Sequence, residues 1–242
     1  MRFSVIIPAY NEERYLPRLL NSIEVARGNY SGGQDEIEVI VADNDSTDAT
    51  AEIAAVHGAG VVHVAKRRIG AARNGAARSA QGEILCFIDA DSAVHPQTFN
   101  AIDERMKSDR YVWGVTGARL DRKSFALLVT HYMFMPMVWV TGLDIGLSFC
   151  RRKDFEAVGG YDENRFYAED VIFPLALRRL GRTRGQRFTR LPKVKALQCT
   201  RKFDQFGEWH YFRMLGHVVK SLITSNWHDE KLAERYWYNP GR

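Results

Sequence analysis

Short apolar runs alternate with helix-like segments through the first ninety residues, and this alternation most constrains the fold. The apolar runs lie at residues 2–8, 37–41, 60–64 and 85–88, each of strand length. Between the first two runs, Leu16, Leu19, Leu20 and Ile23 recur at helical spacing, and a Gly/Ala-rich helix is predicted at 66–80. Strands that alternate with helices predict an open, mainly parallel sheet with helices on both faces.

Three of these four strands end in polar residues. The three strand ends are Tyr10-Asn11-Glu12, Asp43-Asn44-Asp45 and Asp89-Ala90-Asp91. The carboxyl ends of parallel strands meet at one edge of the sheet, and ligands bind in the crevice outside that edge. The sequence therefore predicts a binding site there.

Asp89 and Asp91 are carboxylates only one residue apart, in a segment called the Asp-Ala-Asp motif below. Such carboxylates repel each other unless a cation or hydrogen-bond donors hold them. A magnesium or manganese ion that also binds phosphate oxygens is one solution, because these ions prefer oxygen ligands. A solvated turn after a strand is the alternative, and the two other polar strand ends favour the metal site.

Phosphate-binding loops of the common kinds are missing. No Gly-x-Gly-x-x-Gly follows the first strand, no P-loop signature occurs, and the nearest pattern, at residues 70–75, has the wrong spacing. A dinucleotide dehydrogenase and a P-loop ATPase are thereby disfavoured. Phosphates would instead be held by a metal and by Arg73, whose small neighbours on the 66–80 helix permit a close approach to the sheet.

Six segments together resemble family 2 inverting glycosyltransferases with the GT-A fold. They lie at residues 5–12, 41–48, 72–82, 89–91, 149–163 and 168–170, and cover roughly residues 3 to 182. The family usually has Gly at the second strand end, where this chain has Asn44-Asp45. Asn also tolerates the left-handed conformation that Gly would supply.

The resemblance implies a GT-A type α/β fold, with a mainly parallel Rossmann-like central sheet flanked by helices in a single domain. Its expected parts are a nucleotide-sugar-binding half at 1–120, an acceptor-binding half at 121–200 and a C-terminal helical extension at 201–242. It also implies a metal-dependent (Mn²⁺ or Mg²⁺) inverting glycosyltransferase. The expected donor is a UDP-sugar, with a GDP-sugar as the alternative, and the acceptor is a saccharide or a lipid-linked or cell-envelope glycan.

The resemblance also assigns roles to residues. On the donor side, the residues expected to bind the nucleotide-sugar are Pro8, Ala9, Tyr10, Glu12, Asp43, Arg73, Asp89 and Ala90. Asp91 is expected to coordinate the metal, with Asp89 beside it. An aromatic ring can pack on a base, and a carboxylate can accept hydrogen bonds from a base or ribose. For Glu12 the alternative is a helix charge favoured by the macrodipole.

On the acceptor side, Asp170 is expected to be the general base and Glu169 to position the acceptor. An inverting transfer needs one carboxylate that takes the proton of the attacking hydroxyl. The alternative is an acidic pair that simply begins a helix, where the macrodipole favours it. Asp144, Gly159 and Gly160 are expected to shape the acceptor site, although the Gly pair could equally form a bare turn after a helix at 153–158.

The remaining features bear on partners and location. The net charge of +5 suits an acidic partner such as a nucleotide or an anionic membrane, and no nucleic-acid motif accompanies it. Residues 125–143, which contain His131 and Pro136, predict a buried or interfacial helix rather than a membrane span, because His, Thr and Met residues interrupt the apolar stretch. A strand begins at residue 3, and the three Cys have no metal or disulfide spacing. We expect a cytoplasmic protein, with peripheral contact to the inner face of the membrane.

Two other functions stay open at this point. A nucleotidyltransferase could use the same paired carboxylates, but it normally needs a Gly-rich basic loop near the first strand, which this chain lacks. A non-catalytic nucleotide-binding protein could keep the fold without catalysing a reaction.

His210 or His217 could also complete a metal site, although a His on an apolar helix usually has a structural role.

Overall fold

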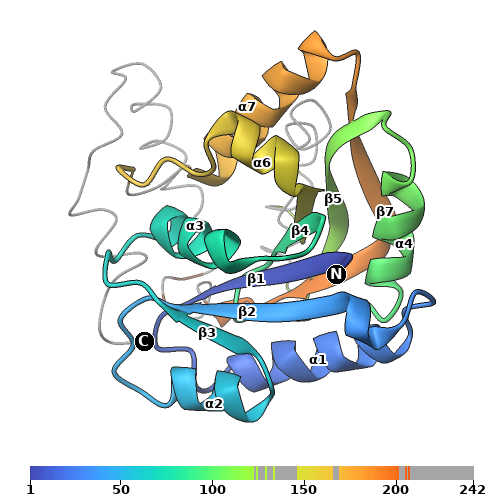
Figure 1. The fold of residues 1–242 in the computed structure, drawn as a ribbon. Helices are drawn as coiled ribbons and strands as arrows, with labels where there is room; N and C mark the ends of the chain where they lie inside the picture. Colours follow the sequence, from blue (N-terminus) through green and yellow to red (C-terminus); the bar gives the residue numbers. More distant parts are fainter. Residues whose placement is uncertain are drawn as a thin grey trace.

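The computed structural model describes residues 1–122, 124, 129, 133, 146–165, 169–201, 205 and 207. A seven-stranded sheet runs through its centre in the order β3-β2-β1-β4-β6-β5-β7 (Figure 1). Its strands are β1 (Phe3–Ala9), β2 (Ile37–Asp43), β3 (Gly60–His63), β4 (Ile84–Phe87), β5 (Tyr111–Leu120), β6 (Ser148–Arg151) and β7 (Arg187–Gln198). Only β6 runs antiparallel to its neighbours β4 and β5. The predicted fold class, an α/β fold with a mainly parallel sheet, is confirmed.

Helices cover both faces of this sheet (Figure 1). One face carries α1 (Leu16–Gly28), α2 (Thr50–Val56) and α4 (Thr98–Met106). The other carries α3 (Ile69–Ser79), α6 (Arg152–Val158) and α7 (Glu169–Thr183), and a short 3-10 turn, η1 (Gln34–Glu36), precedes β2. From β1 to β4 the order follows the alternation of apolar runs and helix-like segments in the sequence.

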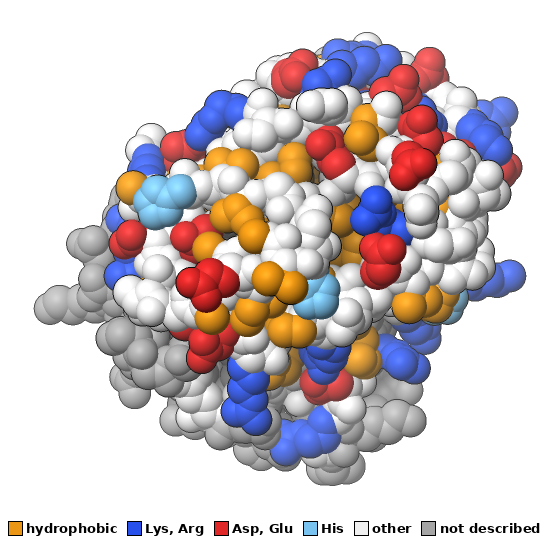
Figure 2. All heavy atoms as spheres, turned by 60° about the horizontal axis from the view of Figure 1, so that its bottom comes forward, with side chains coloured by type: hydrophobic (Ala, Val, Ile, Leu, Met, Phe, Trp, Pro, Cys, Tyr) orange, Lys and Arg blue, Asp and Glu red, His pale blue; other side chains and the backbone are white. Residues whose placement is uncertain are grey.

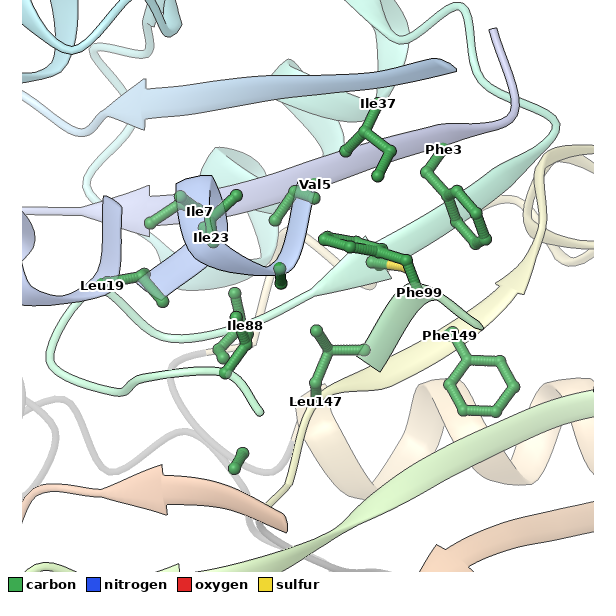
Figure 3. Close-up of a cluster of buried hydrophobic side chains, with 14 of the residues drawn as sticks. Phe3, Val5, Ile7, Leu19, Ile23, Ile37, Ile88, Phe99, Leu147 and Phe149 are labelled. Atoms are coloured by element: carbon green, nitrogen blue, oxygen red, sulfur yellow. The ribbon is translucent and has the colours of Figure 1, made fainter. Parts of the chain in front are cut away.

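The two faces bury separate apolar clusters because successive side chains of a strand point to opposite sides. Val5 and Ile7 of β1 pack with α1 and α4, whereas Ile6 packs with α3. Figure 3 shows the first cluster, in which the Phe3 and Phe99 rings lie 5.3 Å apart. This continuous burial on both sides explains why β1 is apolar at nearly every position.

The strand register brings the polar strand ends together. β1 pairs in parallel with β2, so that Ala9 lies beside Asp43, and it pairs in parallel with β4 on its other side. The loops after these three strands therefore leave the same edge of the sheet. The end of β7 reaches this edge too, because Leu197 forms a bridge with Ala93 in the loop after β4.

Several local expectations need correction. Helix α3 begins at Ile69, later than the predicted residue 66. By residue type, Ser46 or Thr47 could cap the helix after β2, but α2 begins only at Thr50, and Asp48 Oδ1 accepts the Thr50 N–H at 3.0 Å. Ser46 Oγ instead accepts the backbone N–H of Asn11 at 3.1 Å, so its side chain ties two loops together.

The surface and the membrane expectations can be compared with the described residues. On the face shown in Figure 2, Lys and Arg side chains are interspersed with Asp and Glu, so the positive net charge does not form a broad basic surface there. Within the described ranges, no helix is long and apolar enough to span a bilayer. The helix predicted at 125–143 lies outside the described residues, apart from residues 129 and 133.

Candidate active site

The loops after β1 and β2 are joined by hydrogen bonds. Asn11, at a positive φ of 51°, accepts the Thr47 N–H on its Oδ1 at 2.8 Å, while its own N–H binds Ser46. Asn is one of the few residues that adopt this backbone conformation readily, because its short polar side chain can bond locally. The joined loops fix the place of Tyr10 and Asp43 at the sheet edge.

Asp43 ends β2 and is almost fully buried, with 8% of its surface exposed. Its Oδ1 accepts the Ser46 N–H at 3.1 Å, and its Oδ2 lies 3.5 Å from His63 Nδ1. The left-handed residue of this loop is Asp45, at φ 68°, and not Asn44. Asn44 has a different task, because its Nδ2 donates to the carbonyls of Val64 and Lys66 and holds the loop before α3 against β2.

That loop carries Arg67, which stacks on Tyr10 with its Cζ 4.1 Å from the ring centroid. The Nε and Nη2 atoms of Arg67 are buried without a hydrogen-bond partner in the structure. Buried donors without a partner are costly, so these atoms are available to an acceptor on a ligand. Tyr10 thus lies at the edge, as expected, with a cationic side chain on its ring.

Arg73 links the end of β4 to the start of α7. Its Nη2 lies 3.0 Å from Asp89 Oδ1, its Nη1 lies 3.3 Å from Glu169 Oε1, and its Cζ lies 5.1 Å from the Tyr161 ring centroid. Burial disfavours its charge, but Tyr161, Asp89 and Glu169 together raise the pKa of Arg73. A permanent positive charge therefore lies between the predicted donor-side and acceptor-side carboxylates.

Glu169 and Asp170 form the first residues of α7 but differ in environment. Glu169 is 8% exposed, whereas Asp170 is an exposed residue. Burial, followed by the charge of Asp170, raises the pKa of Glu169 to about 7, against the opposing effect of Arg73. Asp170 is therefore the more accessible of the two carboxylates, and Glu169 connects the start of α7 to Arg73.

Asp91 meets a residue that the sequence did not single out, Arg201, directly after β7. Arg201 Nε lies 3.1 Å from Asp91 Oδ2. Its Nη1 donates to Glu12 Oε2 at 2.7 Å, and its Nη2 donates to Glu12 Oε1. Three predicted donor-site carboxylates, Glu12, Asp89 and Asp91, are thus each held by an arginine.

One feature of the sequence could have indicated that Arg201 lies at the site. A basic stretch, Thr200-Arg201-Lys202, follows the polar end of a strand, as the acidic stretches do after β2 and β4. What the sequence did not reveal is that β7 ends beside the Asp-Ala-Asp motif, where Ser92 Oγ donates to Gln198 Oε1 at 2.9 Å. This contact spans 106 positions, which no local pattern encodes.

Gly159 and Gly160 form a left-handed turn after α6, at φ 81° and 72°. The turn packs on α3 beside Arg73, since Asn74 Oδ1 accepts the Tyr161 N–H at 2.9 Å and Asn74 Nδ2 donates to the Tyr161 carbonyl at 2.8 Å. A Cβ on Gly160 would lie 2.6 Å from Asn74 Oδ1. Asp144, His210 and His217, three other predicted site residues, lie outside the described residues.

The carboxylate oxygens of the Asp-Ala-Asp motif are ligands that suit a magnesium or manganese ion. Among the described residues, no group of three or more His, Cys, Asp or Glu side chains could hold a metal ion. Mg²⁺ is usually bound through one or two carboxylates together with phosphate oxygens of the substrate, so a protein cage of three ligands is not required. Asp89 and Asp91 supply such carboxylates, and Asp89 is the more exposed of the two, with 59% of its side chain accessible.

Comparison with known families gives a match along most of the described sheet. The model of the family described as glycosyl transferase family 2 matches residues 4–161. This span includes the ends of β1, β2 and β4, Arg73 and the Gly159-Gly160 turn. It ends before Glu169, Asp170 and Arg201.

Two curated relatives match shorter parts of the chain. Poly(ribitol-phosphate) beta-N-acetylglucosaminyltransferase TarS of Staphylococcus aureus is 35% identical over 104 residues, which are 40% of this chain and 18% of TarS. Dolichyl-phosphate beta-glucosyltransferase of Drosophila melanogaster is 32% identical over 161 residues, which are 58% of this chain and 49% of that protein. The chain thus spans less than half of the length of each relative.

Solved structures show the same fold at lower identity. TarS 1-349 in complex with UDP-GlcNAc superimposes with a TM-score of 0.65 at 22% identity, covering 83% of this chain and 59% of that one. The mannosyltransferase PcManGT of Pyrobaculum calidifontis, in complex with GDP-Man and Mn²⁺, gives a TM-score of 0.64 at 23% identity, covering 81% and 56%. These similarities establish the architecture, including the part of the sheet beyond the family match.

Proposed function

Because the chain belongs to glycosyl transferase family 2, we propose that it transfers a sugar from a nucleotide-diphosphate donor to an acceptor hydroxyl, with inversion at the anomeric carbon. The observation that carries the proposal is the Arg73 bridge at the carboxyl edge of the sheet. One guanidinium contacts Asp89 of the Asp-Ala-Asp motif and Glu169 of the acidic pair. This connection supports the proposal that Asp89 serves the donor and that the acidic pair serves the acceptor in one site.

The donor nucleotide is proposed to lie across the ends of β1 and β2. Tyr10 offers a ring face and Asp43 a buried carboxylate that can accept from a base N–H or a ribose hydroxyl. Arg67 has two buried N–H donors without a partner. UDP-sugars are the favoured donors because TarS was solved with UDP-GlcNAc, and a GDP-sugar is the alternative because PcManGT was solved with GDP-Man.

The diphosphate is proposed to lie over the Asp-Ala-Asp motif, with Asp91 and Asp89 as the protein ligands of a Mn²⁺ or Mg²⁺ ion. When bound, such an ion neutralises charge on the departing diphosphate. Arg73 supports the same end of the site by holding Asp89 and by placing a positive charge beside it. The Mn²⁺ ion in the PcManGT complex supports a divalent ion of this kind at the proposed site.

On the acceptor side, Asp170 is proposed to take the proton of the attacking hydroxyl. A general base must be ionised, and Asp170 is exposed at the start of a helix, where a negative charge is favoured. Glu169 is buried and has a raised pKa, so it is proposed to position Asp170 and Arg73 and not to act as the base. The Gly159-Gly160 turn is proposed to border the acceptor.

The proposed acceptor is a saccharide or a lipid-linked or cell-envelope glycan. The names of the two curated relatives, with a poly(ribitol-phosphate) and a dolichyl-phosphate acceptor, support a search among envelope polymers and lipid phosphates. A lipid-linked acceptor would bring the protein to the inner face of the membrane, and flotation with vesicles that carry the acceptor tests that contact.

The deciding experiment is a transfer assay with UDP-glucose, UDP-N-acetylglucosamine and GDP-mannose, in the presence of Mn²⁺. Release of nucleoside diphosphate together with a glycosylated product of inverted anomeric configuration is expected. Asp91→Asn and Asp170→Asn should each nearly abolish turnover, whereas Glu52→Gln, on the exposed side of α2, should keep it. Pyrophosphate as the product would indicate a nucleotidyltransferase, and nucleotide binding without any turnover would indicate a non-catalytic protein.

A further inference from the structure

Arg201 lies where a cation at Asp91 would be expected. Its Nε contacts Asp91 at 3.1 Å, and its two Nη atoms hold Glu12 in a bidentate arrangement. The three side chains are largely buried, with 18%, 15% and 6% exposed for Arg201, Asp91 and Glu12. A guanidinium with all three nitrogens used in this way is tightly placed, because its planar fork matches a carboxylate.

The backbone before Arg201 is fixed at the same edge. Thr200 donates to Asp121 Oδ1 from both its N–H, at 3.1 Å, and its Oγ1, at 2.8 Å. Arg201 also stacks on Tyr15, with Cζ 4.7 Å from the ring centroid. Its position is therefore set by the residue that follows β5 and by the segment between β1 and α1, and does not depend on a chance surface contact.

The charge of Arg201 cannot be removed by a change of pH. An arginine guanidinium stays protonated in proteins, so Arg201 keeps its positive charge beside Asp91. A second cation that approaches the same Asp91 oxygens meets repulsion from Arg201, and this repulsion is strong in a site of low dielectric constant. Arg201 must therefore move before a divalent ion can take its place.

The two ends of the Arg201 contact differ in strength. Glu12 is bound through two nitrogens, whereas Asp91 is bound through Nε. The guanidinium can consequently release Asp91 while Glu12 still holds it. Besides the nucleotide-sugar binding that the resemblance leads us to expect, Glu12 would thus keep the arginine charge near the site after Asp91 is released.

We propose that Arg201, held by Glu12, is an internal cation that occupies Asp91 in the donor-free protein and that the divalent ion displaces it. The ion and Arg201 compete for one carboxylate, so metal binding is linked to the position of the chain directly after β7. This inference rests on the metal site of the proposed function, and it concerns binding, so that it can be tested without turnover.

Titration of Mn²⁺ into the full chain without nucleotide tests the competition, with free Mn²⁺ measured by electron paramagnetic resonance. Arg201→Gln should bind Mn²⁺ about ten-fold more tightly than the wild type, because one opposing charge is removed from Asp91. Glu12→Gln, which weakens the hold on Arg201, should show a smaller gain. Asp91→Asn should remove the gain in the Arg201→Gln background.

Arg18→Gln is the matched control. Arg18 lies at the same edge and contacts the backbone carbonyl of Asp91 and the carboxylate of Asp121, but not the carboxylate of Asp91. Its loss should leave the Mn²⁺ affinity unchanged. If Arg201→Gln does not fold, Arg201→Lys keeps one charge but cannot reach both carboxylates, and an affinity gain of about three-fold is expected.

Equal or weaker Mn²⁺ binding by the folded Arg201 variant would overturn the proposal, as would an equal gain in Arg18→Gln. The outcome is separable from that of the proposed function. A protein that shows the predicted order of Mn²⁺ affinities but transfers no sugar would support the competition and refute the transferase. A protein that transfers sugar, but whose Arg201→Gln variant binds Mn²⁺ with unchanged affinity, would support the transferase and refute the competition.

Discussion

Arg73 on α3 and Glu169 on α7 form a buried ion pair, with 3.3 Å between Nη1 and Oε1, across 96 positions of the chain. The same guanidinium reaches Asp89 with its other Nη at 3.0 Å. One side chain therefore sets the distance between the loop after β4 and the first turn of α7. Loss of this side chain should affect stability and the site together.

Arg73→Gln is expected to lower the free energy of unfolding by about 3–5 kcal/mol, because Glu169 would be left buried without its cation. Urea denaturation followed by circular dichroism measures this loss. Arg78→Gln, on the same helix, is the control, since the Arg78 side chain is 67% exposed and pairs with Glu163 at the surface. Its loss should change stability by no more than about 0.5 kcal/mol, and equal effects of the two changes would refute a buried bridge.

The ionisation of Glu169 should make stability fall as the pH rises. Burial raises the pKa of Glu169 from 4.5 to about 7, so between these values the folded protein binds more protons than the unfolded chain. The free energy of unfolding therefore decreases through this range. In Glu169→Gln this contribution should disappear, because Gln resembles the protonated carboxyl. Urea denaturation at a series of pH values should therefore show the wild type losing stability relative to the variant as the pH rises from about 4.5 to about 7.

Glu163 provides a control of opposite sign. A hydrogen bond from Asn74 lowers the pKa of Glu163, against a smaller effect of burial. Its contribution to stability is therefore present above the ordinary pKa of a glutamate and is lost as the pH falls through the lowered value. The difference between the wild type and Glu163→Gln should change below about pH 4.5, and a change in the same direction and range as for Glu169 would contradict both assignments.

Asp170→Asn separates catalysis from binding. If Asp170 is the base, its loss should lower kcat by about 10²–10⁴-fold while the affinity for UDP, measured by calorimetry, stays close to that of the wild type. Asp43→Asn should show the converse, a weaker affinity for UDP, because Asp43 lies at the opposite side of the site at the end of β2. A normal kcat in Asp170→Asn would exclude it as the base.

The two neighbouring glycines give a matched pair of substitutions. Both have a positive φ, so Ala at either costs about 1 kcal/mol from the left-handed backbone. At Gly159 the added Cβ meets nothing within 4 Å, whereas at Gly160 it would lie 2.6 Å from Asn74 Oδ1 and 2.9 Å from Phe155 Cζ. Gly160→Ala should therefore cost about 3 kcal/mol in total. Equal losses in thermal or urea unfolding would show that Asn74 can move aside.

The sequence by itself determined the order of strands and helices in the first ninety residues and the edge of the sheet at which the predicted site lies. Burial of β1, β2 and β4 on both faces requires apolar runs, and the helices between them require helical spacing, so both patterns are local and readable. Because parallel strands end at the same edge, the polar residues after β1, β2 and β4 could be placed together before the structure was known.

Only the tertiary structure decided which side chains hold one another. Ser46 looked like a helix cap but binds the loop after β1, and Asp45, not Asn44, takes the left-handed conformation. Arg201 could not be connected to Asp91 and Glu12, since its place depends on the pairing of β7 with β5 and on the bridge to Ala93. Such contacts join residues far apart in the chain, and local patterns carry no information about them.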